Sequence, residues 1–179
     1  AWHVMGVTQA AGYSLAWFQE NIGTEYARKA KEQGCGAFDL INADVQKTPI
    51  GANRLIYLPY LNGERTPHVD PNCRGVFFGL SSMHTTADMA RAVMEGIQYS
   101  LTDCNDIIKE MGIEVSEMMA CGGGAKNAVQ RQMMADMFGC DVNTVTATEG
   151  PALGVAILAA VVATLWFSIW YFKTTKKLW

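Results

Sequence analysis

Three consecutive glycines, Gly122, Gly123 and Gly124, constrain the fold of this chain most strongly. They follow an apolar run at residues 118–120 and precede a segment with helical character at residues 128–138. Glycine has no Cβ atom, so a flat ligand can approach the backbone of such a turn closely. The unpaired N–H groups of the following helical turn favour negative charge. The pattern fits a nucleotide site and a plain tight turn equally, because the spacings of a P-loop and of a dinucleotide fingerprint are both absent.

Composition narrows the class of protein. A length of 179 residues, half of them hydrophobic, allows one domain with a real core. The formal net charge is −3 and no basic stripe is present, which argues against a nucleic-acid partner. Five cysteines without a Cys-x-x-Cys pair indicate free thiols in a reducing compartment. The first residues lack an initiator Met and a basic signal region, and we interpret them as the interior of a longer chain.

Hydrophobic spacing predicts an alternation of helices and strands. Helices are expected over residues 6–21, 24–33, 85–111 and 128–138 and from residue 151 onward, with strands over residues 54–60, 76–80, 118–121 and 142–145. Thr85 and Asp88 have the spacing of a capping box. Residues 38–53 are polar and turn-rich, and residues 61–74 form a long loop of the kind that usually carries function. The second half therefore predicts an α/β arrangement.

The C-terminal segment leaves two possibilities open. Residues 151–172 contain no charged side chain, and as a helix they would extend about 33 Å, enough to cross a bilayer. Trp166 and Trp170, followed by Lys173, resemble an aromatic belt with a positive flank. Alternatively, residues 151–160 form a buried helix of a soluble domain, and an unrelated hydrophobic tail follows.

Several stretches carry motifs that are specific to one protein family. Residues 75–80 (Gly-Val-Phe-Phe-Gly-Leu), then seven residues, then residues 88–95 resemble the second signature of the FGGY carbohydrate kinases. Residues 58–68 (Leu-Pro-Tyr-Leu-Asn-Gly-Glu-Arg-Thr-Pro-His) are similar to the loop found in its xylulokinase members, from which glycerol and gluconate kinases usually differ. The glycine run and residues 149–154 resemble the family's nucleotide loop and last core helix. The similarity extends from about residue 2 to residue 160.

The resemblance implies an α/β fold, the actin-like or RNase H-like ATPase domain at the C-terminal end of a sugar kinase, incomplete on its N-terminal side. Residues 1–161 would be the partial ATP-binding domain and residues 162–179 an atypical hydrophobic and basic tail. A soluble core helix over residues 151–160 leaves about eleven apolar residues, too few to span a bilayer, so we expect no membrane partner. The resemblance further implies ATP and Mg²⁺ as cofactors, a missing N-terminal kinase domain as partner, a cytoplasmic location and a homodimer in the intact enzyme.

Within this segment the resemblance implies binding residues and no catalytic base or metal ligand, because the base of the family is an Asp of the N-terminal domain. Arg65 could offset charge on the transferred phosphoryl group, and an ion pair with Glu64 is the alternative. An N-cap role is the alternative for Asn127. The expected nucleotide contacts are Gly122, Gly123, Gly124, Ala125 and Asn127, with Gly63, Glu64 and Arg65 near the phosphates.

The function that the resemblance implies is transfer of the γ-phosphoryl group of ATP to a sugar hydroxyl, converting D-xylulose to D-xylulose 5-phosphate. The 179 residues are expected to be inactive on their own. Two alternatives remain: a kinase of this family for another sugar (gluconate, ribulose or glycerol), or a non-enzymatic actin-like module attached to a membrane or a partner through its aromatic tail.

Overall fold

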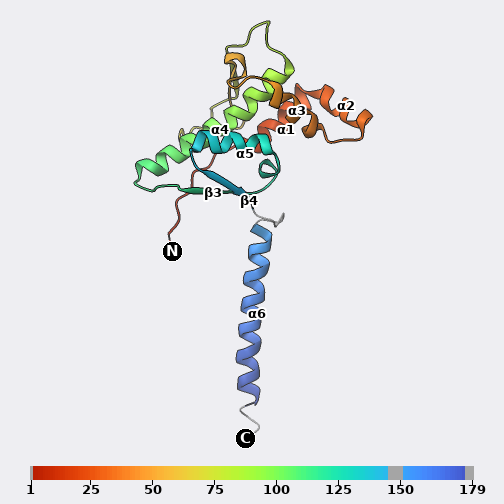
Figure 1. The fold of residues 1–179 in the computed structure, drawn as a ribbon. Coiled ribbons are helices and arrows are strands. Elements are labelled where there is room, and N and C mark those ends of the chain that lie inside the picture. Colours follow the sequence, from red (N-terminus) through yellow and green to blue (C-terminus); the bar gives the residue numbers. More distant parts are fainter. Residues whose placement is uncertain (1, 145–150, 176–179) are drawn as a thin grey trace. The chain divides into compact units, whose positions relative to one another are not determined.

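The structure, a computed structural model, describes residues 2–144 and 151–175. The chain divides into two units, Ala1–Asn143 and Thr144–Trp179, whose elements are drawn in Figure 1. The first unit mixes helices with short strands. The second contains α6 (Pro151–Thr175).

The elements before α6 follow one another closely. In chain order they are α1 (Ala11–Asn21), α2 (Thr24–Gln33), α3 (Ala37–Lys47), the short 3₁₀ helix η1 (Ala52–Arg54), β1 (Ile56–Leu58), β2 (Val76–Phe78), α4 (Thr86–Glu110), β3 (Glu117–Ala120), the 3₁₀ helix η2 (Gly124–Lys126), α5 (Ala128–Phe138) and β4 (Asp141–Thr144). Among the described residues, β1 pairs with β2 and β3 pairs with β4.

The central element of the first unit is α4, which packs against β1, α1, α3 and α5. Its start is fixed by the predicted capping box: the Thr85 hydroxyl accepts from the Asp88 N–H, and the Asp88 carboxylate accepts from the Thr85 N–H. Exposed positions such as Asp103 and Asp106 lie in the second half of α4, whereas every residue from 91 to 98 in its first half is buried. Several neighbouring elements cover it instead of one.

Close approach between α4 and β1 depends on Gly96. A Cβ atom at this position would collide with the carbonyl oxygen of Tyr57. Tyr57 is buried between the exposed Ile56 and Leu58, as expected for alternation along a strand. Its ring lies 4.7 Å from that of its register partner Phe77, measured between centroids. The hydrophobic core therefore continues from α4 into the β1–β2 ribbon.

The core draws on every helix of the first unit. Its largest contributors are aromatic, branched and methionine side chains that lie far apart in the sequence. They are Phe18 of α1, Tyr26 of α2, Ile41 and Val45 of α3, Val93, Met94 and Ile97 of α4, and Met133 of α5.

Two sequence predictions about the N-terminal half are wrong. The first helix begins at Ala11 rather than at residue 6, because Val7 forms backbone and side-chain hydrogen bonds with Thr66. Residues 38–53, predicted to be turn-rich, contain most of α3. The apolar pair Ile41 and Val45, four residues apart and both buried, was the helical signal in this polar stretch.

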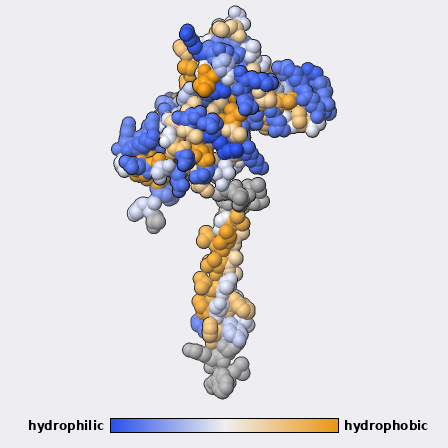
Figure 2. Space-filling view, in the orientation of Figure 1, coloured by the Kyte–Doolittle hydropathy of each residue, from blue (hydrophilic) through white to orange (hydrophobic). Residues whose placement is uncertain are grey.

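The second unit is the apolar helix α6, which carries hydrophobic side chains along its length (Figure 2). Its segment Ala152–Thr174 is long and apolar enough to cross a bilayer, judged by length and composition alone, and its side chains are not buried. The hydroxyls of Thr164, Ser168 and Thr174 each donate to the carbonyl four residues earlier. The helix continues unbroken past residue 160, so the apolar residues on both sides of that position belong to one helix.

Candidate functional site

The glycine run forms a loop between β3 and α5. Gly122 has φ of +80°, a left-handed conformation that favours glycine, and Gly124 begins η2. Asn127 is the N-cap of α5, and its side-chain oxygen accepts from the Val129 N–H at 2.9 Å. The guanidinium of Arg131 donates to the carbonyl of Ala125. The loop is therefore held from its C-terminal side by the first turn of α5.

A cavity of about 520 Å³ lies beside this loop. The first turns of α1 and α3 supply an apolar wall, and α3, the loop and α5 supply polar groups. The lining residues are Gly12, Leu15 and Ala16 of α1, Phe38, Asp39 and Asn42 of α3, Gly123, Gly124 and Lys126 of the loop, and Asn127 and Gln130. A cavity with apolar walls and a few polar groups is typical of a small-molecule site.

A network of hydrogen bonds links the two sides of the cavity. The Asn127 side-chain nitrogen donates to the side-chain oxygen of Asn42 at 2.6 Å, which joins residues 85 positions apart. One turn earlier on α3, one carboxylate oxygen of Asp39 accepts from the Gly36 N–H at 3.1 Å. The other carboxylate oxygen has no hydrogen-bond partner within the described part of the chain. The cavity thus has a rigid edge that presents both donors and acceptors.

Gln130 is the most deeply buried polar side chain of the lining, with 7% of its surface exposed. Its amide makes no hydrogen bond to any residue that the structure describes. Its oxygen lies 3.0 Å from the position that a Cβ atom at Gly124 would occupy. The amide atoms are not among the buried unpaired groups of the described residues, so they are accessible to a ligand or to water in the cavity.

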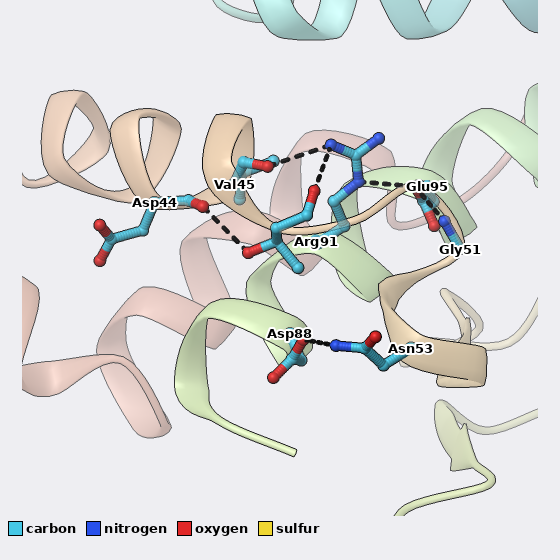
Figure 3. Close-up of polar contacts among 8 residues, drawn as sticks. Asp44, Val45, Gly51, Asn53, Asp88, Arg91 and Glu95 are labelled. Atoms are coloured by element: carbon cyan, nitrogen blue, oxygen red, sulfur yellow. Dashed lines mark hydrogen bonds and ion pairs between the residues drawn. The ribbon is translucent and has the colours of Figure 1, made fainter. Parts of the chain in front are cut away.

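A buried ion pair fixes the position of α3 (Figure 3). The Arg91 Nε donates to Glu95 at 2.7 Å, and the same guanidinium donates to the carbonyls of Val45 and Thr48 at the end of α3. Glu95 also accepts from the Gly51 N–H at 3.0 Å. The Arg91 guanidinium therefore adds a charged donor at the C-terminus of α3, where the Val45 carbonyl also accepts from the Thr48 N–H. This network holds α3 against α4. α3 supplies Asn42 and part of the apolar wall of the cavity.

Other hydrogen bonds fix the elements around this network. Burial alone raises the pKa of Asp88, but hydrogen bonds from Thr85 and Asn53, with His84 nearby, leave that pKa below its ordinary value. Burial, followed by the charge of Asp44, raises the pKa of Tyr26, whose hydroxyl donates to Asp44 between α2 and α3.

The second predicted group of residues, Gly63, Glu64 and Arg65, does not line the cavity. Glu64 is only 4% exposed and accepts from the backbone N–H groups of Gln9 and Arg65. The structure describes no salt bridge for Arg65, whose side chain is exposed, so the alternative of a Glu64–Arg65 ion pair is wrong. The second carboxylate oxygen of Glu64 is buried without a partner among the described residues.

The cavity therefore unites only part of the predicted set. Gly123, Gly124 and Asn127 line it, whereas Gly122 shapes the turn and Ala125 is buried behind the loop. The sequence interpretation missed the residues that face the loop from α1 and α3, and it did not include Lys126 among the expected contacts. The helical spacing of Ile41 and Val45 would have placed Asp39 and Asn42 on a helix. Only packing brings that helix to the glycine loop.

The chain matches the "FGGY family of carbohydrate kinases, C-terminal domain" over residues 1–163. The chain belongs to the FGGY family. A xylulose kinase of Staphylococcus xylosus is 42% identical over 166 residues, covering 93% of this chain and 32% of that protein. Among solved structures, ligand-bound xylulose kinase from Lactobacillus acidophilus superposes with a TM-score of 0.73 at 30% identity, covering 88% of this chain and 30% of the other. Xylulose kinase from Rhodospirillum rubrum has a TM-score of 0.74 at 29% identity, with the same coverage.

These similarities confirm the expected FGGY family and the actin-like ATPase fold of its C-terminal domain. The chain spans about a third of the length of the xylulose kinases it matches. The glycine loop, α5 and the cavity all lie inside the matched region, whereas the aromatic end of α6 extends beyond it.

Proposed function

We propose that this chain is the ATP-binding part of an FGGY kinase that transfers the γ-phosphoryl group of ATP to a hydroxyl of D-xylulose. The observation that carries the proposal is the cavity beside the glycine loop. It has an apolar wall that suits a nucleobase, and the N-terminus of α5 lies close by. Similarity to xylulose kinases supports the choice of sugar. Gluconate, ribulose and glycerol are the alternative acceptors.

In this proposal the base of ATP lies in the cavity, and the triphosphate extends past the glycine loop. Because Gly123 and Gly124 have no side chains, the nucleotide can approach the backbone closely. Lys126, at the cavity rim, would offset phosphate charge. Gly63, Glu64 and Arg65 are proposed to act near the transferred phosphate, and the exposed Arg65 guanidinium is free to do so.

Mg²⁺ is expected to accompany ATP. The residues described by the structure include no group of three or more His, Cys, Asp or Glu side chains that could hold a metal ion. We therefore assign no metal ligand to them. A magnesium ion bound with ATP would be held by phosphate oxygens and water.

The remaining chemistry is proposed to belong to a partner domain. An N-terminal kinase domain would supply the Asp base and most sugar contacts, and the intact enzyme would be a cytoplasmic homodimer. Since these 179 residues span about a third of the length of their relatives, we expect them to bind ATP without phosphorylating D-xylulose.

Isothermal titration of the full 179-residue chain with ATP in the presence of Mg²⁺ tests the proposal. Binding of ATP at the cavity, reduced when Leu15 or Phe38 is replaced by a charged residue, is the expected result. A folded chain that binds no ATP would show that the proposed nucleotide site is wrong. Turnover of D-xylulose in a coupled assay would overturn the expectation of inactivity.

One observation favours a second candidate function, association with a membrane. The segment Ala152–Thr174 has the length and composition of a spanning helix, and the hydroxyls of Thr164 and Ser168 are hydrogen-bonded within the helix, as a lipid environment requires. Flotation of the full chain with phosphatidylcholine vesicles tests this candidate. Recovery in the vesicle fraction supports membrane association, and recovery only in the aqueous fraction rejects it.

A further inference from the structure

The polar edge of the cavity carries a preference between nucleobases, and we propose that Asn42, oriented by Asn127, selects adenine over guanine. The inference rests on the proposed function, because it requires the cavity to hold the base of a nucleotide. A purine has two flat apolar faces and a polar edge. The apolar wall of Leu15, Ala16 and Phe38 suits a face, and α3 places polar groups beside that wall.

The orientation of the Asn42 amide follows from a chain of hydrogen bonds that begins at the backbone. The Val129 N–H can only donate, so the Asn127 group that faces it must be the side-chain oxygen. The Asn127 nitrogen therefore donates to Asn42, whose accepting group must be its own oxygen. The Asn42 NH₂ group is left as a fixed donor at the edge of the cavity, with no other partner in the described chain.

Asp39 supplies the complementary acceptor on the same helix. It precedes Asn42 by three residues, and side chains at this spacing lie on one face of a helix. One Asp39 oxygen accepts from the Gly36 N–H, and the other has no partner in the described chain and is open to a ligand. The face of α3 that lines the cavity thus presents one acceptor and one donor in a fixed order.

This order matches the six-membered-ring edge of adenine. The exocyclic amine of adenine donates, and the neighbouring ring nitrogen N1 accepts, so Asp39 and Asn42 would each meet a partner. In guanine the corresponding positions are the O6 acceptor and the N1–H donor. Guanine in the same pose would place O6 against the Asp39 carboxylate and N1–H against the Asn42 NH₂ group. Unpaired or repelling groups of this kind are the usual source of discrimination.

The amide of Gln130 is a second, independent polar group that is open to this cavity. It is more than nine-tenths buried, lines the same space and has no protein partner within the described chain. Its amide atoms are not among the buried unpaired groups of the described residues, so a ligand with hydrogen-bonding groups at its edge could pair with them. A purely apolar ligand would not explain the position of this amide.

Titration of the full chain with ATP, GTP and inosine triphosphate tests the inference. Asn42→Asp keeps the oxygen that accepts from Asn127 and replaces the donor by an acceptor of nearly the same size. We expect the ratio of ATP affinity to GTP affinity to fall at least about tenfold, equivalent to about 1.4 kcal/mol. Inosine triphosphate should follow GTP, because it has the same O6 and N1–H groups.

Two further variants distinguish the loss of nucleobase recognition from the general effect of an added negative charge. Gln46→Glu adds the same charge at an exposed position of α3 outside the cavity, and it should leave the ratio unchanged. Asn42→Ala removes the donor without adding charge, and it should weaken ATP binding more than GTP binding.

The outcomes distinguish this inference from the proposed function. If the wild-type chain binds ATP and both Asn42 variants, with wild-type circular dichroism, keep the wild-type ratio, Asn42 does not select the base and the nucleotide site stands. If the wild-type chain binds none of the three nucleotides, the proposed function and the inference both fail.

Discussion

At the scale of single residues, the glycine loop shows how three identical residues acquire different roles. Gly122 adopts a conformation that other residues avoid. A Cβ atom at Gly123 would meet nothing within 4 Å, and one at Gly124 would approach the Gln130 amide at 3.0 Å. Gly122 therefore shapes the turn, whereas Gly124 leaves room where the cavity and α5 meet.

Replacement of Gly124 by valine should weaken ATP binding. The branched side chain would press on Gln130 and fill part of the cavity, so we expect affinity to fall at least about tenfold, or about 1.4 kcal/mol. Isothermal titration with ATP measures the change. Ala128→Val, at an exposed position outside the cavity, is the matched control. A folded Gly124→Val variant with wild-type affinity would reduce this glycine to a structural turn.

Asp88 should make a pH-dependent contribution to stability. Its folded pKa lies below the ordinary value of 3.8, so the unfolded state binds more protons as the pH falls toward that value. The stabilisation is present above pH 3.8 and is lost as the pH falls through the folded pKa. Asp88→Asn should lower the free energy of unfolding by about 1–2 kcal/mol at neutral pH.

Urea unfolding of wild type and Asp88→Asn at a series of pH values measures this contribution. The difference between the two proteins should shrink as the solution is acidified below pH 3.8. Asp103→Asn, at an exposed position on α4, controls for the general effect of removing a carboxylate. A difference that stays constant down to acid pH would contradict the assignment.

At the scale of elements, α3 depends on α4 for its position. Arg91 is 9% exposed and Glu95 3%, measured on their side chains, and together they satisfy the end of α3 and the Gly51 N–H that follows it. Arg28 and Glu32 have the same i,i+4 spacing on α2 but are 65% and 59% exposed. The two ion pairs have the same spacing in the sequence, but one is buried and holds the end of α3, whereas the other is exposed on α2.

Arg91→Ala should destabilise the fold strongly. It leaves the buried Glu95 carboxylate without its cation and removes one donor from each of the carbonyls of Val45 and Thr48, so we expect a loss of about 3–5 kcal/mol. Arg28→Ala, at the exposed pair, should cost less than about 1 kcal/mol. Chemical denaturation of both variants makes the comparison. Equal losses would mean that the network around α3 does not stabilise it.

At the scale of the whole molecule, α6 differs in character from the rest of the chain. Its apolar side chains, including Leu165, Trp166, Phe167 and Trp170, are exposed along the helix. Residues 1–163 match the family domain. The proposed boundary between a kinase domain at residues 1–161 and a tail at residues 162–179 falls inside the continuous helix α6.

Removal of residues 162–179 should reduce self-association. Large contiguous apolar surfaces drive association in water, so we expect the full chain to form oligomers in detergent-free buffer and the shortened chain to form fewer. Sedimentation velocity measures both. A monodisperse full chain that loses thermal stability on shortening would show instead that these residues belong to a folded core.

The sequence alone determined the features that depend on neighbouring residues. The limits of α2 and α5, the capping box of Thr85 and Asp88, and the strand–glycine–helix order around Gly122 all follow from local propensity, capping and chain flexibility. The family motifs are local as well. These features are determined by contacts within one or two helical turns, so a linear pattern is enough to predict them.

Only the tertiary structure decided which elements form the cavity. Asn42 is hydrogen-bonded to Asn127, which lies 85 residues further along the chain. Val7 is not helical as predicted, because it is hydrogen-bonded to Thr66. The polarity of residues 38–53 obscured α3, whose few apolar side chains are stabilised by burial against α4 rather than by propensity. Burial energy and long-range hydrogen bonds depend on distances in space. For this reason the polar edge of the site could not be predicted from the sequence.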